Sequence, residues 1–152
     1  MHDPEPRSPV GIDTLPRRAK NIIENLHEIA YAHNGVSGAK VAACIAYGNK
    51  VISYGLNSRK THPLQKKWGR NIQAIAIHAE IDAIKNALRH IDVEELKHTT
   101  LYVARSKKDG SYGLAKPCIG PDGCGCQSAI AAFGIQRVIW TTDNNGMVEG
   151  MF

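Results

Sequence analysis

Apolar residues in this chain switch repeatedly between helical and strand spacing, and this alternation limits the possible folds more than any other feature. A first helical stripe runs from Ile22 to His33. Two short apolar runs follow, Val41 to Ala46 and Val51 to Leu56, and the Gly48-Asn49 pair between them predicts a tight antiparallel hairpin. A second helical stripe extends from Ile77 to Ile91. The first half of the chain therefore predicts a helix, a hairpin and a second helix.

The second half continues the alternation with shorter elements. Leu101 to Ala104 and Val138 to Thr142 have the composition of strands. Between them, Ala129 to Phe133 predicts a helix that Gly134 ends. Helices that connect successive strands usually place those strands parallel, whereas a hairpin is antiparallel. We therefore predict an α/β sandwich built around a mixed sheet.

The length of 152 residues suits a single domain, and a hydrophobic content of 43% is enough for a core. Residues 1–12 contain prolines among charged and small side chains and lack periodicity, so we expect a flexible N-terminal arm followed by one domain over residues 13–152. No apolar run approaches the roughly 18 residues of a membrane span, and no signal-peptide pattern opens the chain. We expect a soluble, cytoplasmic protein with no membrane partner.

Two fragments carry the side chains that point to a chemistry. His78-Ala79-Glu80 opens the second helical pattern, and Pro117-Cys118, with Cys124 and Cys126 downstream, precedes the third. Helix N-termini stabilise the thiolate, which is the form of cysteine that binds zinc. Cysteines in a cytosolic chain stay reduced, so a disulfide framework is not expected, and Cys44 in its apolar run is expected in the core. A histidine and downstream thiols thus indicate a Zn²⁺ site.

Glu80 gives this zinc site a catalytic rather than a structural character. Three protein ligands leave the fourth tetrahedral position of Zn²⁺ open to water. A glutamate beside the metal can carry protons between that water, whose pKa is lowered toward about 7, and a leaving group. Three thiols with His78 would instead close a structural site without room for water, but Glu80 speaks against that reading. The fragments therefore indicate a hydrolytic enzyme.

In order and spacing, these fragments resemble the signature of the zinc-dependent cytidine and deoxycytidylate deaminase superfamily. The similarity also covers Gly55-Leu56-Asn57, the run Ile77 to Ile84, and the segment from Cys126 to Ile130 that leads to Gly134-Ile135. It is greatest to the deoxycytidylate (dCMP) deaminase branch. The resemblance extends over most of the chain.

The resemblance implies a cytidine deaminase-like fold, a three-layer α/β/α sandwich with a mixed sheet of about five strands. It implies that His78, Cys118 and a second thiol bind zinc. It makes Glu80 the catalytic proton carrier. It also suggests that Asn57 hydrogen-bonds the sugar or base of the substrate, and we assign Ala79 to the same substrate-binding site.

The cysteine segment departs from the family pattern. The family usually has two residues between its thiols, whereas here Ile119 to Gly123 separate Cys118 from Cys124, and Cys126 follows. Counting back from Ala129-Ile130 favours Cys126 as the third ligand, because the family's second thiol usually stands three residues before such a pair. Cys124 remains the alternative ligand. Glycine and proline in the inserted stretch allow the chain to bulge and return to the helix start.

The loop from Ser58 to Asn71 is the most informative segment for the substrate. Its basic residues are Arg59, Lys60, Lys66, Lys67 and Arg70, with no acidic residue among them. Because the loop follows Asn57 and precedes the zinc-site helix, we expect it at the mouth of the pocket. There Arg59 and Lys60 would bind a phosphate and Trp68 would stack on a base, whereas a solvated loop is the alternative. A second basic stretch consists of Arg105, Lys107, Lys108 and Lys116.

These observations predict zinc-dependent hydrolytic deamination of a cytosine nucleotide, most specifically of dCMP to dUMP with release of ammonia. The first alternative is a deaminase that acts on a base in RNA or single-stranded DNA, or on a purine, because the same site chemistry permits it. The second is a zinc-stabilised nucleic-acid-binding module without catalysis. The resemblance also implies a homo-oligomer.

Overall fold

The computed structural model describes residues 9–33, 40–48, 50–58, 78–117, 126–144 and 146–151. The strands are β1 (Val10–Gly11), β2 (Lys40–Tyr47), β3 (Lys50–Leu56), β4 (Thr99–Ser106), β5 (Tyr112–Gly113), β6 (Arg137–Thr141) and β7 (Met147–Met151). The helices are the 3-10 helix η1 (Ile12–Thr14) and the α-helices α1 (Arg17–Tyr31), α3 (Ala79–Ala87), α4 (Val93–Leu96) and α5 (Cys126–Ala132). Among these described residues, no helix has the length and apolar composition of a membrane span.

The strands form one mixed sheet in the order β1-β7-β6-β4-β2-β3, with β5 paired to β4. Because β2 is antiparallel to both β3 and β4, these two strands run in the same direction. β4 and β6 are parallel neighbours joined through α5, and β7 returns antiparallel to β6. The predicted mixed sheet is confirmed. Beyond its five longer strands, the structure adds β1 and β5 of two residues each.

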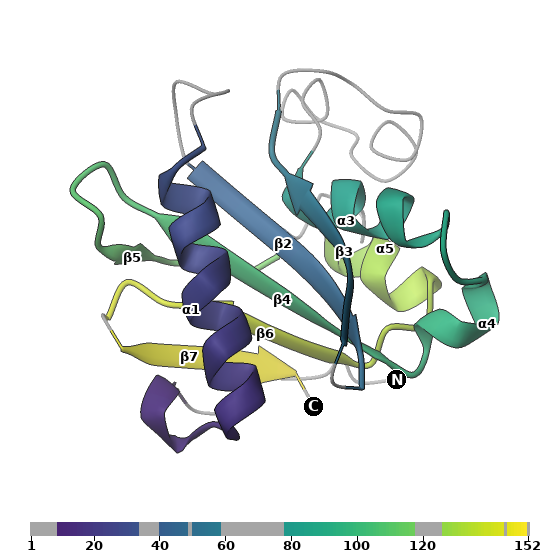
Figure 1. The fold of residues 1–152 in the computed structure, drawn as a ribbon, viewed down its shortest axis with the longest axis horizontal. Helices are drawn as coiled ribbons and strands as arrows, with labels where there is room; N and C mark the ends of the chain where they lie inside the picture. Colours follow the sequence, from purple (N-terminus) through teal and green to yellow (C-terminus); the bar gives the residue numbers. More distant parts are fainter. Residues whose placement is uncertain are drawn as a thin grey trace.

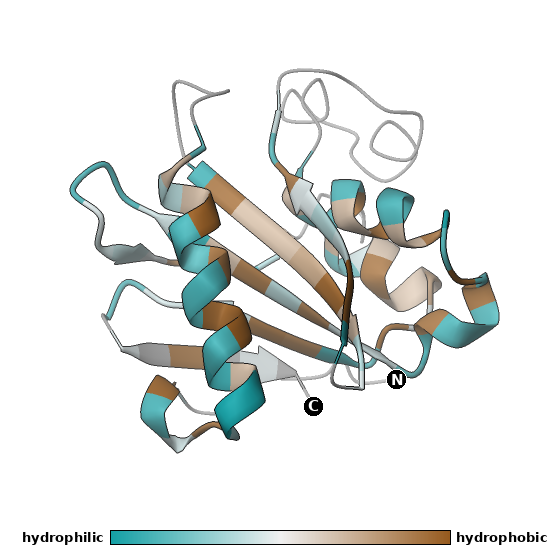
Figure 2. Cartoon of the chain, in the orientation of Figure 1, coloured by the Kyte–Doolittle hydropathy of each residue, from teal (hydrophilic) through white to brown (hydrophobic). Residues whose placement is uncertain are grey.

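Helices cover both faces of the sheet, with α1 on one side and α3 and α5 on the other (Figure 1). Along β4 the side chains alternate between these layers. Leu101 and Val103 pack with α3, whereas Tyr102 and Ala104 pack with α1. Since both faces are buried, the central strands are apolar along most of their length (Figure 2). The predicted three-layer α/β/α sandwich is therefore confirmed.

The second helical stripe extends further along the sequence than the helix does. α3 ends at Ala87, but Leu88 and Ile91 still pack against the core, which explains the apolar spacing beyond the helix. The next element, α4, was not predicted. It begins at a capping box in which Asp92 accepts from the Glu95 backbone N–H and Glu95 accepts from that of Asp92.

The predicted boundary between the N-terminal arm and the domain lies too far along the chain. Residues 1–8 lie outside the described residues, but Val10–Gly11 pair with β7 and Ile12 is buried at 5% exposure. The Ile12 N–H donates to the Gly146 carbonyl at 2.7 Å. Residues 10–12 therefore belong to the folded domain, because they bury an apolar side chain and complete the edge of the sheet at β7.

The start of α3 is held tightly against the end of β3. A Cβ at Gly55 would collide with the Ala79 carbonyl and the Ala83 backbone nitrogen, so only glycine lets the helix approach this strand so closely. The Leu56 N–H also donates to Asp82 Oδ2 at 3.0 Å. These contacts set the position of the first turn of α3 relative to the end of β3.

Candidate active site

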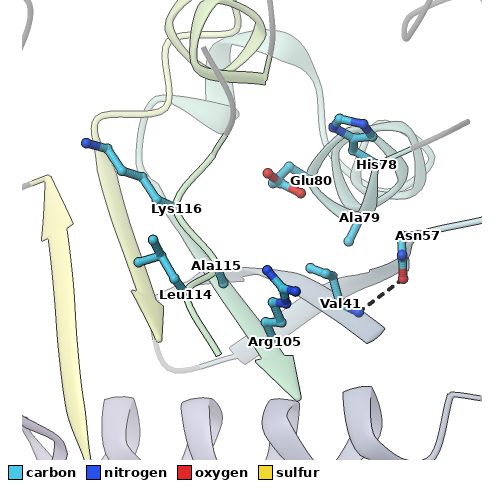
Figure 3. Close-up of a pocket in the computed structure, with 9 residues that line it drawn as sticks. All are labelled: Val41, Asn57, His78, Ala79, Glu80, Arg105, Leu114, Ala115 and Lys116. Atoms are coloured by element: carbon cyan, nitrogen blue, oxygen red, sulfur yellow. Dashed lines mark hydrogen bonds between the residues drawn. The ribbon is translucent and has the colours of Figure 1, made fainter. Parts of the chain in front are cut away.

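A pocket lies at the edge of the sheet where β3 and β4 end. Both strands point toward this edge, and α3 and α5, which each precede the next strand, begin near it. The crevice beside the carboxyl ends of such strands is the usual ligand site of open α/β sheets. The pocket has a volume of about 250 Å³ and is lined by Val41, Asn57, His78, Ala79, Glu80, Arg105, Leu114, Ala115 and Lys116 (Figure 3).

The starts of two helices bring His78 and Cys126 together. His78 is the extended N-cap residue of α3, and Cys126 is the fully buried first residue of α5. His78 Nδ1 lies 3.2 Å from Cys126 Sγ. Two ligands of one tetrahedral zinc ion would place nitrogen and sulfur about 3.5 Å apart, as the metal–ligand bond lengths require. The pair therefore fits a shared zinc ion in spacing and in donor chemistry.

Further thiols of the motif lie outside the described residues. Cys118 and Cys124 fall in the segment 118–125, and within the described ranges no group of three histidine, cysteine, aspartate or glutamate side chains could hold a metal ion. The residue before Cys118 is nevertheless anchored beside α5, because Gln127 Nε2 donates to the Pro117 carbonyl at 3.0 Å. The chain thus enters and leaves this segment close to Cys126.

Glu80 sits in the first turn of α3 and lines the pocket with a side chain that is only 5% exposed. Its carboxylate points into the pocket (Figure 3). The backbone N–H groups and the macrodipole at a helix N-terminus stabilise a carboxylate in this position. Ala79, the preceding residue, is fully buried and contributes to the same wall.

Asn57 continues the pairing of β3 by one residue and also faces the pocket. Its N–H donates to the Val41 carbonyl at 3.3 Å, and the Val41 N–H donates to Asn57 Oδ1 at 3.1 Å (Figure 3). His33 Nε2 lies 2.7 Å from the Asn57 carbonyl oxygen, so the end of α1 also holds this residue. The orientation of the Asn57 amide is thereby set by the protein.

The other predicted substrate-binding residues, Arg59, Lys60 and Trp68, lie outside the described residues. Cys44, by contrast, is fully buried in the core between the sheet and α1, as predicted. Burial raises the pKa of its thiol to about 12, so it stays protonated.

Sequence reasoning did not place Arg105 and Lys116 in the pocket, although it noted both in a basic stretch. The two-residue period of β4 indicates the face of the sheet on which Arg105 lies. Arg105 follows Leu101 and Val103 at a spacing of two, which puts it on the α3 face at the end of the strand. Arg105 also stands opposite Val41 in the register, next to the Asn57 pairing.

Residues 16–142 match the family model for the cytidine and deoxycytidylate deaminase zinc-binding region. The chain belongs to this family. The match includes α1 through β6 and every residue that lines the pocket. A search of curated proteins returned no significant match.

Family membership gives this deaminase its cofactor and its general chemistry. The cofactor is Zn²⁺, since the matched region is the zinc-binding region of these enzymes. The general reaction is zinc-dependent hydrolytic deamination of cytosine. The histidine–cysteine pair and the buried glutamate of the pocket have the donor and proton-transfer chemistry that this reaction needs.

Proposed function

We propose that this deaminase acts on a free cytosine nucleotide and converts dCMP and water to dUMP and ammonia. One observation supports the site most strongly: His78 Nδ1 and Cys126 Sγ lie 3.2 Å apart, and the buried Glu80 lines the same pocket. The excess of 19 basic over 14 acidic residues favours an anionic nucleotide over a neutral nucleoside.

Three residues are our proposed zinc ligands: His78, Cys118 and Cys126, with Cys124 as the alternative to Cys126. Cys126 is preferred because it faces His78, and Cys118 because its neighbour Pro117 is hydrogen-bonded to Gln127. A zinc ion held there acts as a Lewis acid and lowers the pKa of water to about 7.

Glu80 is our proposed proton carrier. It accepts a proton from the attacking water and delivers it to N3 of cytosine while the water oxygen bonds to C4. It then moves the remaining hydroxyl proton to the amino group, the C4–N bond breaks, and ammonia leaves a C4 carbonyl behind. Its burial shields these transfers from bulk solvent.

Asn57 and Ala79 are proposed to position the substrate. The Asn57 Oδ1 accepts from the Val41 N–H, so we assign its Nδ2 as the donor to a substrate oxygen. Ala79 presents a small side chain in the pocket beside Glu80, which leaves room for a planar ring.

Replacing Glu80 with glutamine tests this mechanism. Glu80→Gln keeps the shape of the side chain but cannot accept and release a proton, so kcat should fall by about 100- to 10,000-fold while zinc content stays at the wild-type value. The control is Glu94→Gln, the same change at an exposed residue of α4. Ammonia release and bound zinc are measured together. Wild-type turnover in Glu80→Gln would refute the assignment of Glu80 as the proton carrier. A wild-type protein that binds zinc but releases no ammonia would instead favour a zinc-stabilised binding module.

A further inference from the structure

The pocket contains an arginine that the deamination chemistry does not use. Arg105 stands near the end of β4, and its guanidinium points into the pocket (Figure 3). Its Nε is buried and has no hydrogen-bond partner among the described residues. No ion pair of the described residues includes Arg105 either, so its guanidinium is not committed to a protein partner and can serve a ligand in the pocket.

The stem of Arg105 lies on a surface shaped to receive it. Arg105 pairs with Gly113 of β5, where a Cβ would come within 2.9 Å of Arg105 Cγ and 3.3 Å of its Nε. Thr141, which is fully buried, donates to the Gly113 carbonyl at 2.7 Å and accepts from the Arg105 N–H at 3.1 Å. Glycine at position 113 leaves space for the arginine stem, and the threonine holds the arginine backbone in place.

The charges around Arg105 favour an anion. Lys116 lines the same pocket, and no ion pair of the described residues includes either cation. Glu80 lines the same pocket, but no ion pair of the described residues joins it to either cation. The other nearby carboxylate, Asp143, lies 3.5 Å from Lys107 Nζ and accepts from the Leu114 N–H at 3.1 Å. Among these described residues, neither carboxylate forms an ion pair with a pocket cation, so both cations can meet a negatively charged ligand.

We propose that Arg105, assisted by Lys116, binds the phosphate monoester of the nucleotide substrate and makes the site prefer nucleotides to nucleosides. This inference rests on the proposed function, whose reaction occurs at the other side of the pocket. The guanidinium offers paired N–H donors that match phosphate oxygens. Phosphate recognition is thereby assigned to the end of β4, in addition to the predicted loop 58–71.

The variant Arg105→Gln tests this assignment in steady-state kinetics with dCMP and deoxycytidine. It should lower kcat/KM for dCMP about 10- to 100-fold more than for deoxycytidine, mainly by raising KM. A loss of this size corresponds to the free energy of one charge-assisted hydrogen bond. Arg105→Lys should recover only part of the loss. The matched control is Lys108→Gln, which removes one charge from an exposed residue between β4 and β5. The control should keep the wild-type ratio within about 2-fold.

A second variant moves the arginine without removing its charge. Gly113→Ala should push the Arg105 stem from its place and raise KM for dCMP in the same direction as Arg105→Gln. The dissociation constant of dCMP, measured by calorimetry in the Glu80→Gln background, should rise about 10- to 100-fold when Arg105→Gln is added.

The outcomes separate this inference from the proposed function. Absence of ammonia release from every cytosine compound would end the proposed function, but the dissociation constants would still test Arg105. Deamination of dCMP with an unchanged substrate ratio and an unchanged dissociation constant in Arg105→Gln would overturn the phosphate assignment alone. So would a loss seen only with a single-stranded oligonucleotide, because the phosphate would then belong to nucleic acid.

Discussion

The short distance between one histidine nitrogen and one cysteine sulfur brings the two motifs of the site together. His78 and Cys126 are far apart in the sequence, yet Nδ1 and Sγ lie 3.2 Å from each other. Burial does not by itself identify the thiol that binds metal, since Cys44 is equally buried. Cys44 packs among apolar strand residues with the pKa of its thiol raised to about 12, whereas Cys126 begins a helix and faces a histidine. The neighbours of each thiol, rather than its exposure, set its chemical role.

Serine variants of the two candidate thiols test the ligand assignment. Cys126→Ser should lose most of its bound zinc after dialysis, because a hydroxyl is a much poorer zinc ligand than a thiolate. Cys124→Ser, which removes the neighbouring thiol, should keep about one zinc per chain as the wild type does. Metal content by mass spectrometry gives the answer. Zinc retained in Cys126→Ser but lost in Cys124→Ser would reverse the assignment.

At the residue scale, the site was predictable to the extent that its chemistry lies in short motifs. His78, Glu80 and Cys126 could be found from residue type and order, and the structure brings them to one place. Arg105 could not be found this way, because its position depends on the pairing of β4 with β2 and with β5. Its two-residue spacing from Val103 indicated the face of the sheet but not the pocket.

At the scale of elements, the contact between β3 and α3 positions His78 and Glu80. Gly55 allows the helix backbone to lie directly on the strand, and the hydrogen bond from the Leu56 N–H to Asp82 fixes the register. His78 and Glu80 stand at the start of this helix. A small displacement of α3 would therefore move both groups relative to Cys126 on α5.

An alanine at Gly55 tests this dependence. Gly55→Ala adds a Cβ that collides with the Ala79 carbonyl, so the helix must shift, and the free energy of unfolding should fall by about 1–3 kcal/mol. Zinc content and turnover should fall with it. In the control Gly11→Ala, the new Cβ would be 3.8 Å from its nearest neighbour, and stability should change little. Urea unfolding of both variants measures the difference, and equal stability in the two would contradict this role of Gly55.

Elements with a long apolar pattern were predictable, and those created by tertiary contacts were not. The β2–β3 hairpin, α1 and β6 lie where their spacing predicts them. The two-residue strands β1 and β5 exist because β7 and β4 offer them backbone partners, which no local pattern shows. The capping box of α4 is a local signal for a new helix. The apolar stripe that continues to Ile91 nevertheless obscured the boundary between α3 and α4.

At the scale of the whole molecule, the topology makes one pocket from distant segments. β3 and β4 end at the same edge of the sheet, and α3 and α5 begin there, so residues between positions 41 and 126 meet at the site. The pocket has a carboxylate at Glu80 and cations at Arg105 and Lys116. A substrate with a reactive ring and an anionic group fits this division.

The decisive measurement is ammonia release from the zinc-loaded protein with dCMP, deoxycytidine, dAMP, dGMP and a cytosine-containing single-stranded oligonucleotide. We expect dCMP to give ammonia and an equal amount of dUMP, with a higher kcat/KM than any other compound in the panel. Ammonia from a purine nucleotide or the oligonucleotide, with none from dCMP, would rule out dCMP as the substrate.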